Sequence, residues 1–128
     1  MRPRDAARAL ALGRIAIGAA CAVAPRTAGA LWIGADARRP GTTVFARALG
    51  ARDVLLGAMV LHTVDHPEVA PRWLAATAAC DAVDCASALA VRDDLPPARG
   101  AFGIALAGGA AVAGLALSRA AAARGSAS

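Results

Sequence analysis

The chain has 128 residues, enough for one domain. Alanine accounts for 39 of them, whereas there are only two Phe, two Trp and no Tyr. A water-soluble core made from these residues would contain few of the large side chains that normally stabilise one. Small residues instead favour close packing between helices in lipid. The composition therefore argues for a membrane protein, with a soluble helical protein as the alternative.

The net charge is +5, and all 14 basic residues are Arg. A nucleic-acid surface would need clustered Arg, usually beside aromatic side chains on which bases stack. In this sequence the Arg residues are scattered and aromatic residues are rare. We therefore expect no nucleic-acid partner and interpret Arg near helix ends as contacts to lipid headgroups.

The first apolar segment, residues 6–24, is predicted to be a helix that Pro25 stops. The sequence Ala22-Val23-Ala24 resembles a signal-peptidase site, but Pro25 directly after it blocks cleavage. We therefore expect an uncleaved helix. Residues 27–34 contain Trp32 and are expected to form an interfacial segment at headgroup level.

Three further helices are expected. A polar loop over residues 36–41 precedes a second helix, which Thr42 or Thr43 caps and which runs to about Val64. A third helix covers residues 71–91, and the Asp- and Pro-rich residues 92–97 end it. The fourth covers residues 100–119 and is followed by a tail.

The fourth helix is the clearest membrane span. Residues 100–118 carry no charge, and 19 helical positions cover close to the ~30 Å hydrocarbon core. Small residues at a spacing of four predict a face for close helix packing; they are Ala101, Ala105, Gly109 and Ala113. The other three helices carry internal charges, so we expect them to insert only as a bundle.

The predicted fold is all-α: a four-helix transmembrane bundle, up-and-down, in a multi-pass protein of the cell membrane. Residues 1–120 form its single domain, and residues 121–128 are expected to be a disordered tail. With the N-terminus inside, six Arg fall on the inner side and five on the outer side, so the positive-inside rule barely decides the topology. The expected partners are the lipid bilayer and either a second copy or a partner membrane protein.

Charged residues lie inside the predicted helices and form the candidate site. They are Arg14, Arg47, Arg52, Asp53, Asp81 and Asp84. Asp81 and Asp84 are three residues apart and share a helix face. Because isolated charges are costly in lipid, we expect all six to point inward and to form Arg–carboxylate pairs between helices.

Residues 7–19 align without gaps to residues 46–58, with six identities, and the alignment places Arg14 opposite Asp53. If this similarity is a true internal repeat, corresponding helices carry opposite charges at matching depth. Chance matching in an alanine-rich chain is the alternative.

Two functions remain open. In the favoured one, the charges are buried ion pairs that specify helix packing in a structural or interaction subunit. In the other, they form a path for protons or a small solute in a minimal transporter or channel. The sequence contains no catalytic motif, so we do not expect an enzyme.

No metal or cofactor is expected either. His62 and His66 are four residues apart but straddle a turn that contains Pro67, and a solvated loop is the simpler interpretation. Cys21, Cys80 and Cys85 include no CxxC pair, and we expect small buried apolar side chains.

Two stretches of the chain carry a resemblance. They are the run Gly13-Arg14…Pro25-Arg26…Leu31-Trp32-Ile33-Gly34 and the segment Ala46-Arg47-Ala48-Leu49-Gly50-Ala51-Arg52-Asp53. With them the chain resembles small four-helix multi-pass membrane proteins of unknown function that are common in actinobacteria. The resemblance covers most of the chain and implies a four-helix membrane protein. It implies no activity and no catalytic residue.

Overall fold

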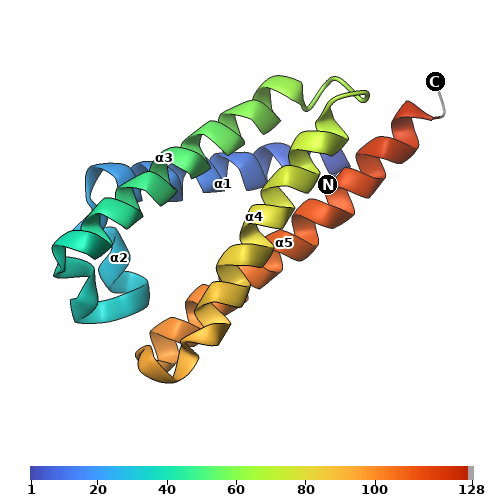
Figure 1. Cartoon of the computed structure of the whole chain (residues 1–128). Helices are drawn as coiled ribbons and strands as arrows, with labels where there is room; N and C mark the ends of the chain where they lie inside the picture. The colour runs from blue at the N-terminus through green and yellow to red at the C-terminus, as the bar shows by residue number, and fades with distance from the viewer. Residues whose placement is uncertain (127–128) are drawn as a thin grey trace.

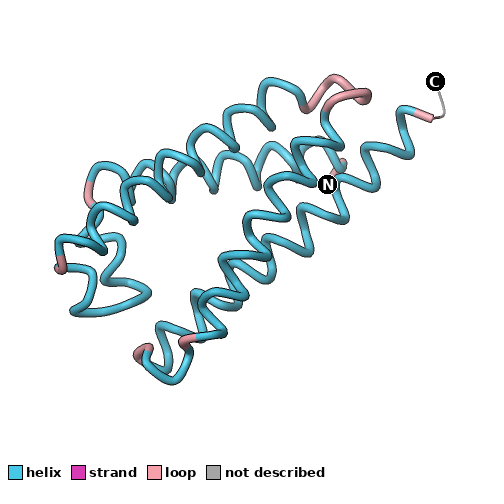
Figure 2. Tube along the Cα trace, viewed as in Figure 1, coloured by secondary structure: helices cyan, strands magenta, loops and turns pink. Residues whose placement is uncertain are grey.

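The computed structural model describes residues 1–126, and within this range it is helical, with short connections and no strand. The all-α prediction is confirmed. The described residues form five α-helices and two short 3-10 helices. Short loops and turns connect the helical segments (Figure 2). The α-helices are α1 (Pro3–Val23), α2 (Pro25–Ile33), α3 (Pro40–Thr63), α4 (Ala70–Ala90) and α5 (Pro97–Gly125). The 3-10 helices are η1 (Gly34–Arg38) and η2 (Arg92–Asp94).

Proline marks the start of every α-helix. Each of the five has Pro at its first or second position, where the missing N–H costs no hydrogen bond. Pro25 therefore starts α2 directly after α1 ends. The expected interfacial segment is thus a short helix, one more than the four predicted. It ends at Gly34, whose φ of 64° favours glycine.

The start of α3 also differs from the prediction. The helix begins at Pro40 and its N-cap is Arg39, which makes no side-chain capping bond. Thr43 lies inside the first turn, and its Oγ1 donates to the carbonyl oxygen of Arg39 at 3.2 Å. The prediction that Thr42 or Thr43 caps this helix is therefore wrong, because Pro40 allows the helix to begin earlier.

The four long helices form two antiparallel pairs (Figure 1). α1 packs mainly against α3, and α4 packs mainly against α5, with fewer contacts between the pairs. The pairs meet at the end that holds the N-terminus and the α3–α4 connection, which we call the closed end. They diverge toward the end that holds α2 and η2, which we call the open end. The core lies at the closed end and includes Ala7, Ala11, Val60, Val64, Ala70, Leu74 and Ala121.

Glycine allows α1 and α3 to approach closely. A Cβ on Gly18 would lie 2.7 Å from the carbonyl oxygen of Gly50, and a Cβ on Gly57 would lie 2.8 Å from that of Ala11. No side chain fits at these positions. In the other pair, Gly114 faces Ala78, and the Ser118 hydroxyl donates to the Pro71 carbonyl at 2.8 Å.

The predicted packing face of α5 is not used within the chain. Ala101, Ala105, Gly109 and Ala113 are all exposed, and a Cβ on Gly109 would meet nothing within 4 Å. The face that carries Gly114 and Ser118 packs on α4 instead, because the Ser118 hydrogen bond and the contact to Ala78 hold it there.

The boundary predicted for the tail is wrong. α5 continues to Gly125, because Ala121 is fully buried in the core at the closed end. Residues 127 and 128 of the predicted disordered tail lie outside the described residues.

Three helices within residues 1–126 are long and apolar enough to cross a membrane: α1, α4 and α5. α3 has 24 residues but carries Arg47, Arg52 and Asp53. Large apolar side chains on the outside of the molecule are exposed, among them Phe45 at 78% and Val112 at 71%.

Candidate functional site

Five charged side chains from three helices meet between the two helix pairs. Arg14 comes from α1, Arg52 and Asp53 come from α3, and Asp81 and Asp84 come from α4. We call these five residues the Arg/Asp cluster. The structure thus brings together five of the six residues that the sequence singled out.

Arg14 is the central cation. It lies on the buried face of α1, which also carries Ala11 and Gly18 at helical spacing. Its Nη1 donates to Oδ1 of Asp53 at 3.0 Å, and its Nη2 donates to Oδ2 of Asp81. Arg14 is 8% exposed and Asp81 is 6% exposed, so this pair is shielded from solvent.

Arg52 forms the second, more accessible part of the cluster. Its Nη1 donates to Oδ1 of Asp84 at 3.2 Å, and its Nη2 donates to Oδ2 of the same carboxylate. Its Nε and Nη2 also donate to Oδ1 of Asp53, at 3.2 and 3.0 Å. The planar guanidinium therefore grips Asp84 through two parallel bonds, a geometry that an ammonium group cannot reproduce.

The bonds form one continuous chain in which Asp53 accepts from both Arg14 and Arg52. The two ends of this chain are Asp81 and Asp84, both on α4. The cluster therefore ties the α1–α3 pair to the α4–α5 pair. It holds three carboxylates and two guanidinium groups, which leaves a net charge of −1 when all five are ionised.

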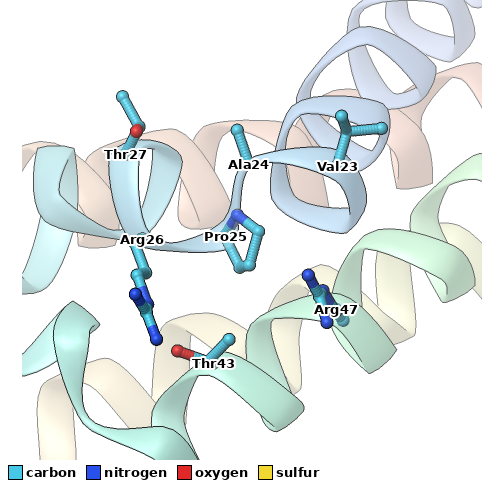
Figure 3. A pocket seen from close by; sticks show the side chains of 7 residues that line it. All are labelled: Val23, Ala24, Pro25, Arg26, Thr27, Thr43 and Arg47. Carbon is cyan, nitrogen blue, oxygen red and sulfur yellow. The ribbon is translucent and has the colours of Figure 1, made fainter.

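Arg47 lies outside the cluster, so the prediction that it is buried there is wrong. It precedes Arg52 by five residues, which is roughly 140° around the helix, and it is exposed. It lines a separate surface cavity of about 410 Å³ at the α1–α2 corner, together with Arg26 and Thr43 (Figure 3). The six predicted residues balanced in charge, whereas the five that meet do not.

The contacts of the antiparallel α1–α3 pair are symmetric under the offset between the two similar segments, residues 7–19 and 46–58. Adding the repeat offset of 39 residues carries Gly18 to Gly57 and Ala11 to Gly50. The Gly18–Gly50 contact and the Gly57–Ala11 contact are therefore equivalent under the repeat. The Arg14–Asp53 ion pair lies between these two contacts. The offset carries Arg14 to Asp53, so the two members of this pair occupy equivalent positions.

A cleft of about 470 Å³ opens beside the cluster, between the diverging helix pairs. Arg14, Asp53, Asp81 and Asp84 line it, whereas Arg52 does not. Trp32, Ser87 and Arg99, which the sequence did not single out as site residues, also line the cleft. No sequence pattern links these three residues, because each lies near the open end of a different helix and only the fold brings them together.

The α2 segment contacts the far wall of this cleft. The Arg99 Nη1 on α5 donates to the carbonyl oxygen of Ala30 on α2 at 3.0 Å. Trp32 contacts α5 near Gly103, where a Cβ would lie 3.5 Å from its ring. Among the described residues, the Trp32 indole N–H is buried and has no hydrogen-bond partner.

The histidines and cysteines are not part of this site. His62 and His66 are exposed at the closed end, where His66 Nδ1 lies 3.7 Å from a carboxylate oxygen of Glu68. Across residues 1–126, no group of three His, Cys, Asp or Glu side chains is arranged to hold a metal ion. All three cysteines are free thiols; Cys21 is buried, while Cys80 and Cys85 are half-buried.

Comparison of the chain with protein-family models, curated proteins and solved structures gives no match.

Proposed function

We propose that the protein is a small multi-pass integral membrane protein, a structural or interaction subunit in which the Arg/Asp cluster joins two helix pairs inside the bilayer. The observation that carries this proposal is the distribution of charge. Of the 23 charged side chains, five belong to the cluster, and the other 18 lie toward the two ends of the molecule.

The two ends carry nine charged residues each. Those at the closed end are Arg2, Arg4, Asp5, Arg8, Asp65, Glu68, Arg72, Arg119 and Arg124. Those toward the open end are Arg26, Asp36, Arg38, Arg39, Arg47, Arg92, Asp93, Asp94 and Arg99. Two polar zones separated by an apolar outer surface match the two headgroup layers of a bilayer.

Helix length supports the same placement. The 21 residues of α1 and of α4 each span about 31 Å, close to the hydrocarbon core of ~30 Å. The exposed side chains between the two polar zones are apolar, including Leu55, Val83 and Val112. Such a surface is costly in water and favourable in lipid. In this placement the cluster lies near mid-bilayer. α3 crosses because Arg52 and Asp53 are paired in the cluster and Arg47 lies toward the open end.

Extraction of membranes with sodium carbonate at high pH tests the placement. We expect the full chain, expressed with a small C-terminal tag, to remain in the membrane pellet. A peripheral membrane protein expressed in the same cells is the control and should be released. Recovery of the chain in the carbonate supernatant, folded and monodisperse, would show that it is a soluble helical protein.

A second candidate function, a minimal transporter or channel for protons or a small solute, is favoured by one observation: three carboxylates of the cluster line an open cleft. Flux into proteoliposomes separates the two candidates. If Arg14→Gln combined with Asp81→Asn leaves the chain folded but abolishes a measurable flux, the transport function is supported. If either single substitution only prevents the protein from accumulating, and the wild type shows no flux, the structural function is supported.

A further inference from the structure

The cleft between the helix pairs has the dimensions of a small-molecule site. Its volume of about 470 Å³ falls within the range of roughly 300–1,000 Å³ that is typical of ligand pockets. It receives side chains from all five α-helices, so its shape depends on the whole fold.

The wall of the cleft is mainly apolar. Leu10 and Ile17 of α1 line it, together with Ile33 of α2, Leu49 of α3 and Leu106 of α5. This lining suits a compact hydrocarbon body, because a ligand that covers it removes apolar surface from water or from disordered lipid.

The polar part of the wall carries excess negative charge. All three carboxylates of the cluster line the cleft, but of its two guanidinium groups only Arg14 does. Both Nη atoms of Arg14 already donate to Asp53 and Asp81. These bonds engage Oδ1 of Asp53 and Oδ2 of Asp81, so each carboxylate keeps a second oxygen for a further donor.

Arg99 is the other cation of the lining, but it cannot neutralise the cluster. It is exposed at the open end, where it donates to the carbonyl of Ala30. Water screens a charge at such a position, whereas the buried Asp81 lies in a region of low dielectric.

We propose that the cleft binds one small organic monocation, an ammonium group on a compact apolar body. The ammonium lies beside Asp53, Asp81 and Asp84 and neutralises the net charge of −1. The apolar body covers the aliphatic wall toward Trp32. This inference uses only the geometry of the cleft, so it does not depend on the proposed function or on membrane insertion.

Other occupants match the cleft less well. An anion would approach three carboxylates, and the Arg14 guanidinium that would attract it is already paired with two of them. A divalent metal ion would require carboxylates free of guanidinium, whereas Arg52 grips Asp84 with two bonds. A lipid acyl chain fits the apolar wall but leaves the excess charge unpaired, which is costly inside the protein.

Three probes of the same shape and different charge test the proposal. They are cyclohexylmethylamine, which is protonated at pH 7, neutral cyclohexylmethanol, and cyclohexanecarboxylate. Binding is measured by calorimetry on the full chain in a neutral maltoside detergent, with empty micelles as the blank. We expect the amine to bind at least about tenfold more tightly than the alcohol and the carboxylate not to bind, because only the amine pairs with the excess carboxylate.

Two variants locate the bound cation. Asp84→Asn makes the cluster neutral, so we expect it to bring the affinity for the amine to within about threefold of that for the alcohol. Binding of the alcohol serves as an internal check that the variant folds. Gly103→Leu fills the cleft and should weaken both probes, because a Cβ at this position points to Trp32 at an ordinary contact distance of 3.5 Å.

Gly109→Leu is the matched control. It makes the same change on the same helix, but the residue is exposed and a Cβ there meets nothing within 4 Å. We expect it to bind both probes as the wild type does.

Equal affinity for amine and alcohol would mean that the cleft holds a neutral apolar molecule such as an acyl chain, and the proposal would be wrong. It would also be wrong if no probe binds, or if Gly103→Leu and Gly109→Leu behave alike. If carbonate extraction releases the protein from membranes, the same calorimetric titration is carried out in plain buffer and tests the binding proposal there.

Discussion

Arg14 on α1 and Asp53 on α3 pair at 3.0 Å, and they occupy equivalent positions of the two similar segments, residues 7–19 and 46–58. The close contact of Gly18 with Gly50 flanks this pair on one side, and that of Gly57 with Ala11 flanks it on the other. Glycine lets the two backbones approach closely on both sides of this salt bridge, because it removes the side chains that would separate them.

The glycine contact leads to the first prediction. Gly50→Ala should destabilise the fold by about 1–3 kcal/mol, because a methyl group there would overlap the backbone of α1 at Gly18 and Ala22. The free energy of unfolding can be measured by titrating the maltoside-solubilised protein with SDS and following helicity. Gly109→Ala is the control and should cause no loss, since its Cβ meets open space. Equal loss in both variants would contradict the close-contact explanation.

The second prediction concerns the central cation. Arg14→Gln removes both of its ion pairs and leaves Asp81 buried beside an uncharged amide, so we expect a loss of about 3–5 kcal/mol in the free energy of unfolding. The same SDS titration measures it. Arg47→Gln makes the same chemical change on an exposed residue and should alter stability by less than about 0.5 kcal/mol. A similar loss in the two variants would mean that Arg14 is not buried in the cluster.

The third prediction tests the apolar outer surface. Val112→Arg places a charge on the exposed face of α5, midway between the two polar zones, where it costs roughly 2.5–3.5 kcal/mol in lipid. We expect less of this variant to accumulate in carbonate-resistant membranes. Ala123→Arg adds the same charge at the closed end, close to Arg119 and Arg124, and should insert like the wild type. If Val112→Arg accumulates as well as Ala123→Arg does, this surface does not face lipid.

Much of the local structure follows from the sequence. Pro25 and the polar breaks near residues 36–41 and 92–97 place the boundaries of the four long helices to within three residues, except the end of α5, which lies six residues beyond the predicted one. The sequence also shows that most charged residues lie near the ends of the helices. This pattern depends only on whether each side chain is more stable in water or in lipid. These are properties of short segments, and they do not depend on which helices are neighbours.

The neighbours of each helix are decided only in the folded chain. The spacing of Asp81 and Asp84 puts them on one face, but the sequence does not say that Arg14 and Arg52 reach them while Arg47 turns away. Nor does it say that α5 packs through Gly114 and leaves the row of small residues from Ala101 outside. Helix rotation is fixed by contacts between distant residues, and a shift of a single residue changes it by about 100°.

Sequence alone thus determined that the chain is helical, where its long helices run and which charges lie within them. Tertiary structure decided which of those charges meet, that three carboxylates face two guanidinium groups, and that a cleft opens beside them. The physical reason is that an ion pair or a cleft belongs to no single helix. The ion pairs form where α1, α3 and α4 bring side chains within reach of one another, and the cleft opens where the two helix pairs diverge.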